Sequence, residues 1–474
     1  MIRIVFALVL LISSSIANEK LEDELKSSTS SNVTLEQLVE LVKRNNSSIK
    51  IAEFEKKIKE YERSVAVGYM FGSLDFSETY SRTNHAGYVF GMKMASRETT
   101  FDDFGFDQFL AAMPNLMNPA TSAEASKQVL ATQPKNLNHP DARDNYETKF
   151  SYQLPIYTGG KLQSYREIAS KLQKLYGINK ESVMVQKVAE AKKSYYDLLL
   201  LQGFIDDLEE IDANVKRLTL SVEEFIKEGY AKNVDLLEVK AKATEVEENL
   251  IKARANKELM LAFLSFLAGS DIVSVQGSFK EIDYQRKSAD EIVQKNKNIK
   301  MAEVGSQIAK KNIDLEESSF YPTLGGFAEG GWNDNQFADF NDNDYYMFGV
   351  QAKLNIFNGG IDSANYQKAK IGYLKAKEQE NQAKSGIKLQ ATQLLAEIKA
   401  LEARVDALKA KVELNKQIYK NYEQRYIERL ASMNDLLIKE SELLEAVMKL
   451  HKVQNEKNAK IFEMEKLSGE EIVR

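Results

Sequence analysis

The chain has 474 residues, of which 28% are charged, with a formal net charge of −6 and no cysteine. The acidic excess argues against a nucleic-acid surface, and the lack of cysteine excludes disulfides, thiolate metal sites and a cysteine nucleophile. Three histidines (His85, His139 and His451) stand far apart, without metal-ligand spacing. No catalytic, nucleotide or cofactor motif occurs, so we expect no enzyme, no cofactor and no metal. A carboxylate hydrolase stays open as an enzymatic alternative, but nothing in the sequence positions a pair of carboxylates.

The N-terminus predicts an export signal. Arg3 precedes an apolar run at 4–12 and small residues before Asn18, the pattern of a signal peptide at 1–17. A polar N-terminal linker follows at 18–33. Beyond it, no apolar run reaches the ~18 residues that a membrane helix needs. We therefore expect an exported protein without a membrane helix.

The remainder of the chain is predicted to consist of two copies of one unit, each with a short helix, strands, a long helix and a second short helix. In repeat 1 (34–269) these lie at 34–70, within 74–157, at 160–228 and at 233–267. In repeat 2 (288–469) they lie at 288–320, within 323–357, at 360–428 and at 433–467. An equatorial linker at 270–287 joins the two.

Identical residues at fixed offsets indicate the repetition. LPIYTGG at 154–160 and LNIFNGG at 354–360 lie 354 − 154 = 200 residues apart. Asn46 and Asn296 lie 296 − 46 = 250 residues apart, so the first copy has 250 − 200 = 50 extra residues, at about 93–143. Such self-similarity is typical of structural repeats. The extra residues fall inside a strand hairpin and are expected to form a long extracellular loop with a short helix.

The strands are predicted from alternation with period two. At 146–156 apolar side chains occupy even positions and polar ones occupy odd positions, and 346–356 has the same pattern. Such strands have one apolar and one polar face. Less regular partners run from Leu74 to Tyr80, with a continuation toward Met94, and at 323–332. A half-buried strand of a soluble sandwich is the alternative, but the flanking segments have helical rather than strand periodicity.

Each strand pattern ends at two glycines, after which the period becomes helical. Because glycine tolerates a left-handed backbone, Gly159-Gly160 and Gly359-Gly360 are expected to be strand-to-helix corners. Apolar residues then step by three and four from Leu201 to Phe225, as in a coiled-coil seam. The first long helix would have 228 − 160 + 1 = 69 residues, or roughly 100 Å at 1.5 Å per residue.

Strands with an apolar face on an exported chain favour a membrane barrel, because only helices and closed barrels satisfy their backbone inside a bilayer. Four strands cannot close, since single-chain barrels have about eight or more. The expected fold is therefore a membrane β-barrel plus a long α-helical coiled-coil barrel. Each chain has two structural repeats and contributes four strands to a shared twelve-stranded trimeric barrel.

In these motifs the sequence resembles the TolC family of outer-membrane efflux ducts. The resemblance covers about 34–469 and rests on the two Gly-Gly stretches, on Asn45-Asn46-Ser47-Ser48-Ile49, and on Asp235-Leu236-Leu237 with Asp435-Leu436-Leu437. It implies a homotrimer in the outer membrane of a Gram-negative bacterium, with its helical body in the periplasm. It also implies three partners, namely a periplasmic adaptor (membrane fusion) protein, an inner-membrane pump of the RND, ABC or MFS type, and outer-membrane lipid.

The resemblance places the site residues at the helix-to-helix turns. The expected adaptor-contact tip consists of Gly229, Tyr230, Ala231, Lys232, Arg429, Leu430, Ala431 and Ser432. The expected channel constriction and gate consist of Asp435, Ile438 and Tyr426. Arg429 replaces a glycine of the family, which predicts a less sharp second turn. Asp435 matches an acidic ring of the family, whereas Ile438 replaces a second aspartate. Asp435 also stands where it would cap the next helix, as Asp235 would in the first copy, so both roles stay open.

The leading interpretation is the exit duct of a tripartite efflux or type I secretion system, a passive trimeric channel across outer membrane and periplasm that is gated at its periplasmic tip. Its cargo stays open. The alternative is a periplasmic coiled-coil structural or adaptor protein. Adaptors usually have one helical hairpin between β-rich halves, whereas this sequence predicts two strand–helix copies.

Overall fold

The computed structural model describes residues 30–279, 281–282, 284–337, 339 and 343–470. The predicted signal peptide (1–17) and most of the predicted linker (18–33) lie outside them. The chain divides into two compact units. The bundle unit comprises Met1–Ile58, Lys174–Gly305 and Ala376–Arg474, and the sheet unit comprises Lys59–Gln173 and Ser306–Lys375. Among the described helices, none combines the length and the apolarity needed to cross a bilayer.

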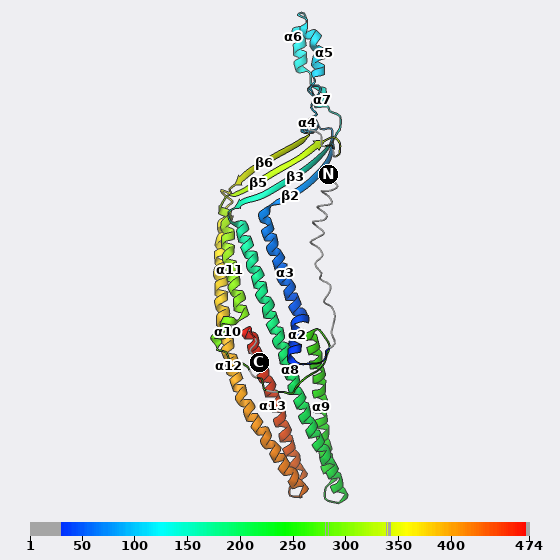
Figure 1. The fold of residues 1–474 in the computed structure, drawn as a ribbon, viewed down its shortest axis with the longest axis vertical. Coiled ribbons are helices and arrows are strands. Elements are labelled where there is room, and N and C mark those ends of the chain that lie inside the picture. Colours follow the sequence, from blue (N-terminus) through cyan, green and yellow to red (C-terminus); the bar gives the residue numbers. More distant parts are fainter. Residues whose placement is uncertain (1–29, 280, 283, 338, 340–342, 471–474) are drawn as a thin grey trace. The chain divides into compact units, whose positions relative to one another are not determined.

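An antiparallel sheet dominates the sheet unit (Figure 1). In spatial order its strands are β2 (Ser73–Thr83), β3 (Arg143–Thr158), β5 (Thr323–Asp334) and β6 (Asp344–Lys353). Phe76 lies opposite Phe150, and Ala328 opposite Phe348. Because the register brings matching positions together, most apolar side chains of the four strands share one face, while Phe327 and Met347 lie on the other face with Glu329. Within the described chain, β2 and β6 have no partner on their outer edges.

The insertion between β2 and β3 (residues 84–142) is helical, contrary to the prediction of a loop at about 93–143 with one short helix. It contains α4 (Ala86–Ala95), the 3₁₀ turn η2 (Phe101–Phe104), α5 (Phe106–Met117), α6 (Ser122–Ala131) and α7 (Lys135–Asn138). The predicted continuation of β2 toward Met94 is also wrong. The chain turns at His85 into α4, whose Val89 is buried and whose Lys93 pairs with Asp103 of η2.

The second strand pattern, predicted to run to 356, ends at Lys353. Lys353 pairs with Thr323, the first residue of β5, so the residues that follow have no strand to pair with. In contrast, β3 continues to Thr158, because Thr158 still pairs with Thr323 of β5.

Eight helices of the described chain carry the remainder of the fold. They are α2 (Leu35–Asn45), α3 (Ser47–Gly68), α8 (Lys161–Lys227), α9 (Asn233–Ala268), α10 (Ala289–Lys295), α11 (Lys297–Glu317), α12 (Ile361–Ile427) and α13 (Met433–Ser468). The turns η1 (Tyr69–Phe71) and η3 (Ser318–Phe320) follow α3 and α11. The predicted seam of α8 is the core of the bundle unit, where Leu208 and Val222 are fully buried against α9, α12 and α13 side chains.

Both first short helices are interrupted at a buried asparagine, which the predictions of continuous helices at 34–70 and 288–320 did not include. The side-chain amide of Asn46 donates to the Leu267 carbonyl at 2.8 Å, and that of Asn296 to the Leu467 carbonyl at 2.7 Å. The Asn296 side-chain oxygen accepts from the backbone N–H of Ile299 at 3.0 Å. Each asparagine therefore begins a new helix and ties it to the end of α9 or α13.

Two segments predicted as linkers contain strands. β1 (Ser30–Val33) and β4 (Ile272–Val275) pair in parallel, with Val33 opposite Val275. Val33 and Ile272 are buried in the same apolar cluster as Leu38 of α2. The pairing joins the start of the described chain to the segment between α9 and α10.

Candidate gate at the helical tips

Two helical hairpins, α8–α9 and α12–α13, end in turns with the same backbone geometry. The N–H of Tyr230 donates to the Phe225 carbonyl at 2.7 Å, and that of Leu430 to the Arg425 carbonyl at 2.7 Å. Gly229 has a φ of 78° and Arg429 a φ of 66°, both left-handed. The prediction that the second turn is less sharp is therefore wrong. Arg429 adopts the glycine conformation at a cost of about 1–2 kcal/mol.

The two tips contact each other through Arg429. Its guanidinium carbon lies 3.7 Å from the centroid of the Tyr230 ring. A cation over an aromatic face at such a distance contributes about 0.5–1 kcal/mol at an exposed site. One turn deeper, the rings of Phe225 and Tyr426 lie 5.9 Å apart. These two contacts connect the α8–α9 hairpin to the α12–α13 hairpin.

Asp435 caps α13. Its carboxylate accepts from the Ser432 backbone N–H at 3.2 Å and from the Ser432 hydroxyl at 2.7 Å, while the Asp435 N–H donates to that hydroxyl oxygen. These hydrogen bonds, above all that from the Ser432 side chain, lower the pKa of Asp435. Asp235 accepts from the Lys232 N–H at 2.8 Å in the first hairpin. Asp435 and Ser432 therefore form the reciprocal cap of a helix N-terminus, whereas Asp235 makes only the half in which the carboxylate accepts, because a lysine side chain has no acceptor.

The three residues expected at the constriction do not lie together on one surface of the chain. Asp435 and Ile438 are exposed on α13, and Ile438 is 45% exposed. Tyr426 is buried in the core between the hairpins, where burial and, next, the Asp235 carboxylate raise its pKa. Tyr426 therefore holds the hairpins together, and Asp435 and Ile438 present their side chains to the surroundings.

The other residues expected at the tip are mostly on the surface. Tyr230 and Leu430 are 58% and 64% exposed. Lys232 and Ser432 are exposed and hold the aspartate caps, whereas Ala231 packs partly against the core. The tips thus present a mixed apolar and basic surface beside the two caps.

Glu440 of α13 is a functional candidate that the sequence analysis missed. It is only 3% exposed, and neither carboxylate oxygen has a hydrogen-bond partner within the described chain. Burial raises its pKa to about 7, against the opposing effect of Lys242 on α9, whose ammonium is 2.8 Å from Glu245. The sequence contained a signal: Glu440 stands four residues from both Leu436 and Leu444, which are buried, so it occupies the apolar stripe of its helix.

The glycine pairs lie where β3 leads into α8 and where the chain after β6 leads into α12. All four glycines have φ between 63° and 89°, a range that other residues rarely adopt. A Cβ at Gly159 would also lie 2.5 Å from the Ser318 carbonyl oxygen, whereas one at Gly359 would meet open space. The left-handed backbone of the two turns favours glycine in both pairs. Close packing against the Ser318 carbonyl excludes a side chain only at Gly159.

The sheet has one apolar and one polar face. On the apolar face Leu74, Phe76, Phe348 and Val350 are 50–77% exposed. On the polar face the Lys149 ammonium lies 3.8 Å from the Glu329 carboxylate. So many neighbouring exposed apolar side chains indicate a surface that contacts a membrane or another protein, whereas the opposite face carries charged side chains.

The chain is similar in sequence to one protein family and in fold to several solved structures. Residues 289–469 match the family model of the outer membrane efflux protein. The outer membrane protein VceC of Vibrio cholerae is similar at 16% identity and a TM-score of 0.73, over 92% of this chain and 96% of that one. The CmeC outer membrane channel of Campylobacter jejuni is similar at 15% identity and a TM-score of 0.72, over 96% and 93%. The MtrE outer membrane channel of Neisseria gonorrhoeae is similar at 14% identity and a TM-score of 0.72, over 96% and 97%. No curated protein matches the chain. The resemblance inferred from the sequence is thus confirmed.

Proposed function

We propose that this chain, whose residues 289–469 match the outer membrane efflux protein family model, forms the trimeric exit duct of a tripartite efflux or type I secretion system. The observation that carries the proposal is the sheet. It combines an exposed apolar face, a polar face and two edge strands without partners in the described chain. Inside a bilayer such edges are tolerated only if they close.

Three copies would satisfy both edges. Pairing β6 of one copy with β2 of the next gives a barrel of 3 × 4 = 12 strands, within the range of outer-membrane barrels. Its apolar face would contact lipid and its polar face would surround water. In this arrangement the two halves of the chain act as structural repeats, with a glycine corner after the strands of each.

The tips supply the gate in this proposal. Opening the channel separates the α8–α9 and α12–α13 hairpins, which breaks the contact of Arg429 with Tyr230 and parts Phe225 from Tyr426. Asp435 of each copy then contributes a negative charge to the constriction, which favours cations. The exposed tip residues are the surface for a periplasmic adaptor, and an inner-membrane pump provides the energy.

The proposal is tested by the mass of the protein purified in detergent. We expect a trimer that runs as a trimer on a gel unless it is heated, and that precipitates when detergent is withdrawn. A monomer that stays in solution without detergent would instead support the periplasmic coiled-coil or adaptor alternative.

A further inference from the structure

Glu440 and Asn458, both on α13, are the only described side chains with two buried polar atoms that lack a hydrogen-bond partner. An amide does not titrate, whereas the carboxyl of Glu440 can ionise. Buried polar groups almost always have partners, so each exception calls for an explanation. Glu440 is the exception with chemical consequences, because the cost of burying a carboxyl depends on its charge.

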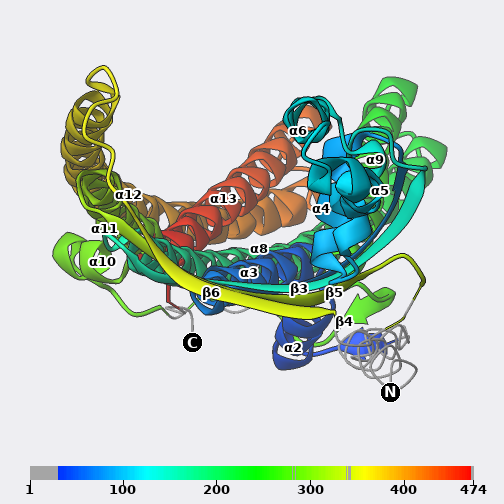
Figure 2. The ribbon, with the colours of Figure 1, turned by 90° about the horizontal axis from the view of Figure 1, so that it is seen from above.

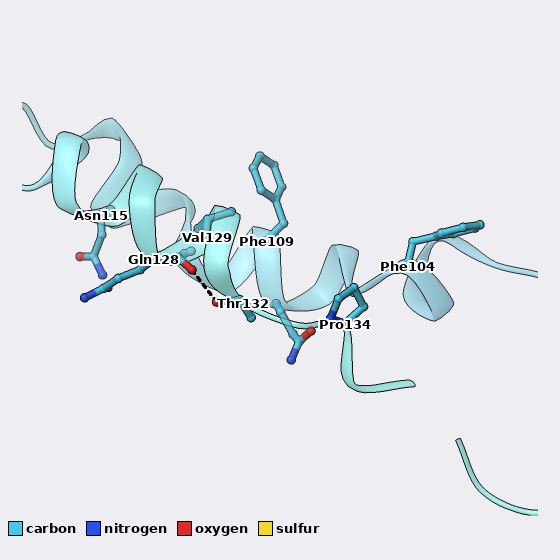
Figure 3. Close-up of a pocket in the computed structure, with 11 residues that line it drawn as sticks. Phe104, Phe109, Asn115, Gln128, Val129, Thr132 and Pro134 are labelled. Atoms are coloured by element: carbon cyan, nitrogen blue, oxygen red, sulfur yellow. Dashed lines mark hydrogen bonds between the residues drawn. The ribbon is translucent and has the colours of Figure 1, made fainter. Parts of the chain in front are cut away.

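The polar side chains of the insertion show the ordinary case. A cavity of about 310 Å³ beside α5 and α6 has Asn115, Gln128 and Thr132 in its lining (Figure 3). The Thr132 hydroxyl donates to the Gln128 carbonyl at 2.8 Å, and no side-chain polar atom of these three residues is buried without a partner. Glu440 departs from this pattern, and it does so in the core of the bundle unit.

Glu440 lies in the seam where the two helical hairpins pack together. Figure 1 and Figure 2 both show these hairpins as two pairs of helices, α8 with α9 and α12 with α13. Leu436 and Leu444 stand one turn before and one turn after Glu440 on α13, and both are buried in the apolar core shared by the four helices. Residues four apart share a helix face, so the Glu440 carboxyl is directed into the same core.

Lys242 occupies a comparable position on the other hairpin. It stands between Val239 and Val246 on α9, both fully buried, and is itself only 7% exposed. Its ammonium pairs with Glu245 at 2.8 Å, whereas neither oxygen of Glu440 receives a hydrogen bond within the described chain. The seam thus contains an acid on one hairpin and a base on the other, close enough to influence each other but not bonded.

Other charged and titratable groups surround Glu440 on the three neighbouring helices. They are Lys242 and Glu245 on α9, Tyr419 and Glu423 on α12, and Arg217 on α8. Tyr419 is buried, and burial, followed by the nearby carboxylates, raises its pKa, so its phenol is neutral when Glu440 titrates. The charge of Glu440 is therefore governed by its burial, by Lys242 and by Glu245.

The neutral form of Glu440 is the one that fits the packed hairpins. Burial raises its pKa from 4.5 to about 7, against the opposing effect of Lys242. Separating the hairpins would return the carboxyl to water and its pKa to the ordinary value. Across the interval of 7 − 4.5 = 2.5 pKa units, the ratio of packed to separated hairpins falls tenfold per pH unit, or about 300-fold per chain. Below and above this interval the ratio is constant.

We propose that Glu440 places the packing of the two hairpins under proton control, so that its protonated side chain keeps them together and its ionisation favours their separation. This rests on the gate proposed above and adds a regulation to it. Lys242 and Glu245 set the pH at which the change occurs. The competing outcome is that Lys242 leaves Glu245 and bonds the ionised Glu440, which would draw the hairpins closer.

The distance between two spin labels tests the proposal. The native chain has no cysteine, so the labels attach only at Val234→Cys on α9 and Ile427→Cys on α12, whose native side chains are 58% and 59% exposed. Complexes with one labelled copy, prepared with an excess of unlabelled chain, are measured in detergent from pH 4 to pH 8. We expect a single short distance in acid and a longer distance that gains population as the pH rises.

Glu440→Gln is the first control, because glutamine has nearly the same shape and stays neutral. It should keep the short distance over the whole pH range. The native pair and the control are also measured with Tyr230→Ala/Arg429→Gly, which removes the contact between the tips and makes separation easier to detect. A native distance that is the same at pH 4 and pH 8 in both backgrounds, or that shortens as the pH rises, would overturn the proposal.

Two further variants give a readout that a purely structural role of Glu440 would not change. Lys242→Gln removes the charge that lowers the pKa of Glu440, and should move the transition to higher pH. Glu245→Gln removes a charge that raises this pKa and frees Lys242, and should move the transition to lower pH. Shifts in the same direction, or a pH response that persists in Glu440→Gln, would assign the change to another group.

The native mass of the same samples separates this proposal from the duct itself. A trimer whose label distance ignores pH would remove the proton control and leave the duct intact. A monomer would contradict the duct, and with it the role of Glu440 in a gate.

Discussion

Arg429, in the turn of one helical hairpin, stacks its guanidinium over the ring of Tyr230 in the turn of the other, at 3.7 Å from the ring centroid. Arg429 is one of two non-glycine residues of the described chain with positive φ. The chain thus accepts a strained backbone at the position that allows this contact. Such strain is usually retained where the surrounding structure or function requires it.

The contact predicts a coupled effect of the two residues. Arg429→Gly removes about 1–2 kcal/mol of backbone strain and loses about 0.5–1 kcal/mol of cation–π energy, so alone the two effects should largely cancel in the free energy of unfolding. In a Tyr230→Ala background the same change should stabilise, because only the strain remains. Thermal unfolding of the four proteins of this double-mutant cycle measures the difference. Equal effects of Arg429→Gly in both backgrounds would show that the contact contributes nothing.

Asp435 is expected to act at the constriction as well as in its cap. Asp435→Asn should reduce cation selectivity in a planar bilayer, because it removes one negative charge per copy. Asp235→Asn is the control, since the Asp235 carboxylate also accepts from a backbone N–H at the start of its helix in the first hairpin. Unchanged selectivity of Asp435→Asn would leave Asp435 with a capping role alone.

The selectivity should also depend on pH in a defined direction. Because hydrogen bonding lowers the pKa of Asp435, the contribution of its ionised form is present above the ordinary aspartate pKa and is lost only as the pH falls through the lowered value. Selectivity should therefore be constant at neutral pH and decline only in strong acid.

The raised pKa of Glu440 predicts that the free energy of unfolding of the helical bundle falls as the pH rises. The pKa is raised from 4.5 to about 7, so between these values the unfolded chain ionises while the folded chain retains its proton. Stability should fall by about 3 kcal/mol per chain across this window, at 1.36 kcal/mol per pKa unit. Glu440→Gln should remove most of this pH dependence in denaturant unfolding between pH 5 and 8. A wild-type curve that is flat or rises in that range would contradict the assignment.

The glycine corners should differ in their tolerance of alanine. Gly159→Ala places a Cβ within 2.5 Å of the Ser318 carbonyl and requires a left-handed alanine, whereas Gly359→Ala meets only the second penalty. We expect Gly159→Ala to lower the dissociation temperature of the trimer much more, with about 1–3 kcal/mol between the two variants. Similar temperatures would mean that the backbone relaxes at the first corner.

The regular elements could be predicted because their patterns are local. The period-two alternation at 146–156 lies within β3, and the seam from Leu201 to Phe225 lies within α8. What could not be predicted depends on distant partners. Asn296 ends one helix and begins the next because its amide finds a carbonyl 171 residues away. The strand β1, which precedes repeat 1 in the chain, forms because it pairs with β4, which follows repeat 1.

The site was predicted only in part for the same reason. The caps of Asp235 and Asp435 follow from the first turn of a helix. The burial of Tyr426 against Phe225 depends on how the two hairpins meet, and the helices of the insertion depend on side-chain contacts such as that of Lys93 with Asp103. A local sequence pattern contains no information about either of these contacts.

The most direct test of the duct is the current through the purified protein in a planar bilayer. We expect discrete conductance steps of one size from the unheated trimer, and larger steps from the double variant Tyr230→Ala/Arg429→Gly, whose tips are no longer held together. Protein that is trimeric in detergent yet never raises the conductance of the bilayer, in either form, would contradict the account.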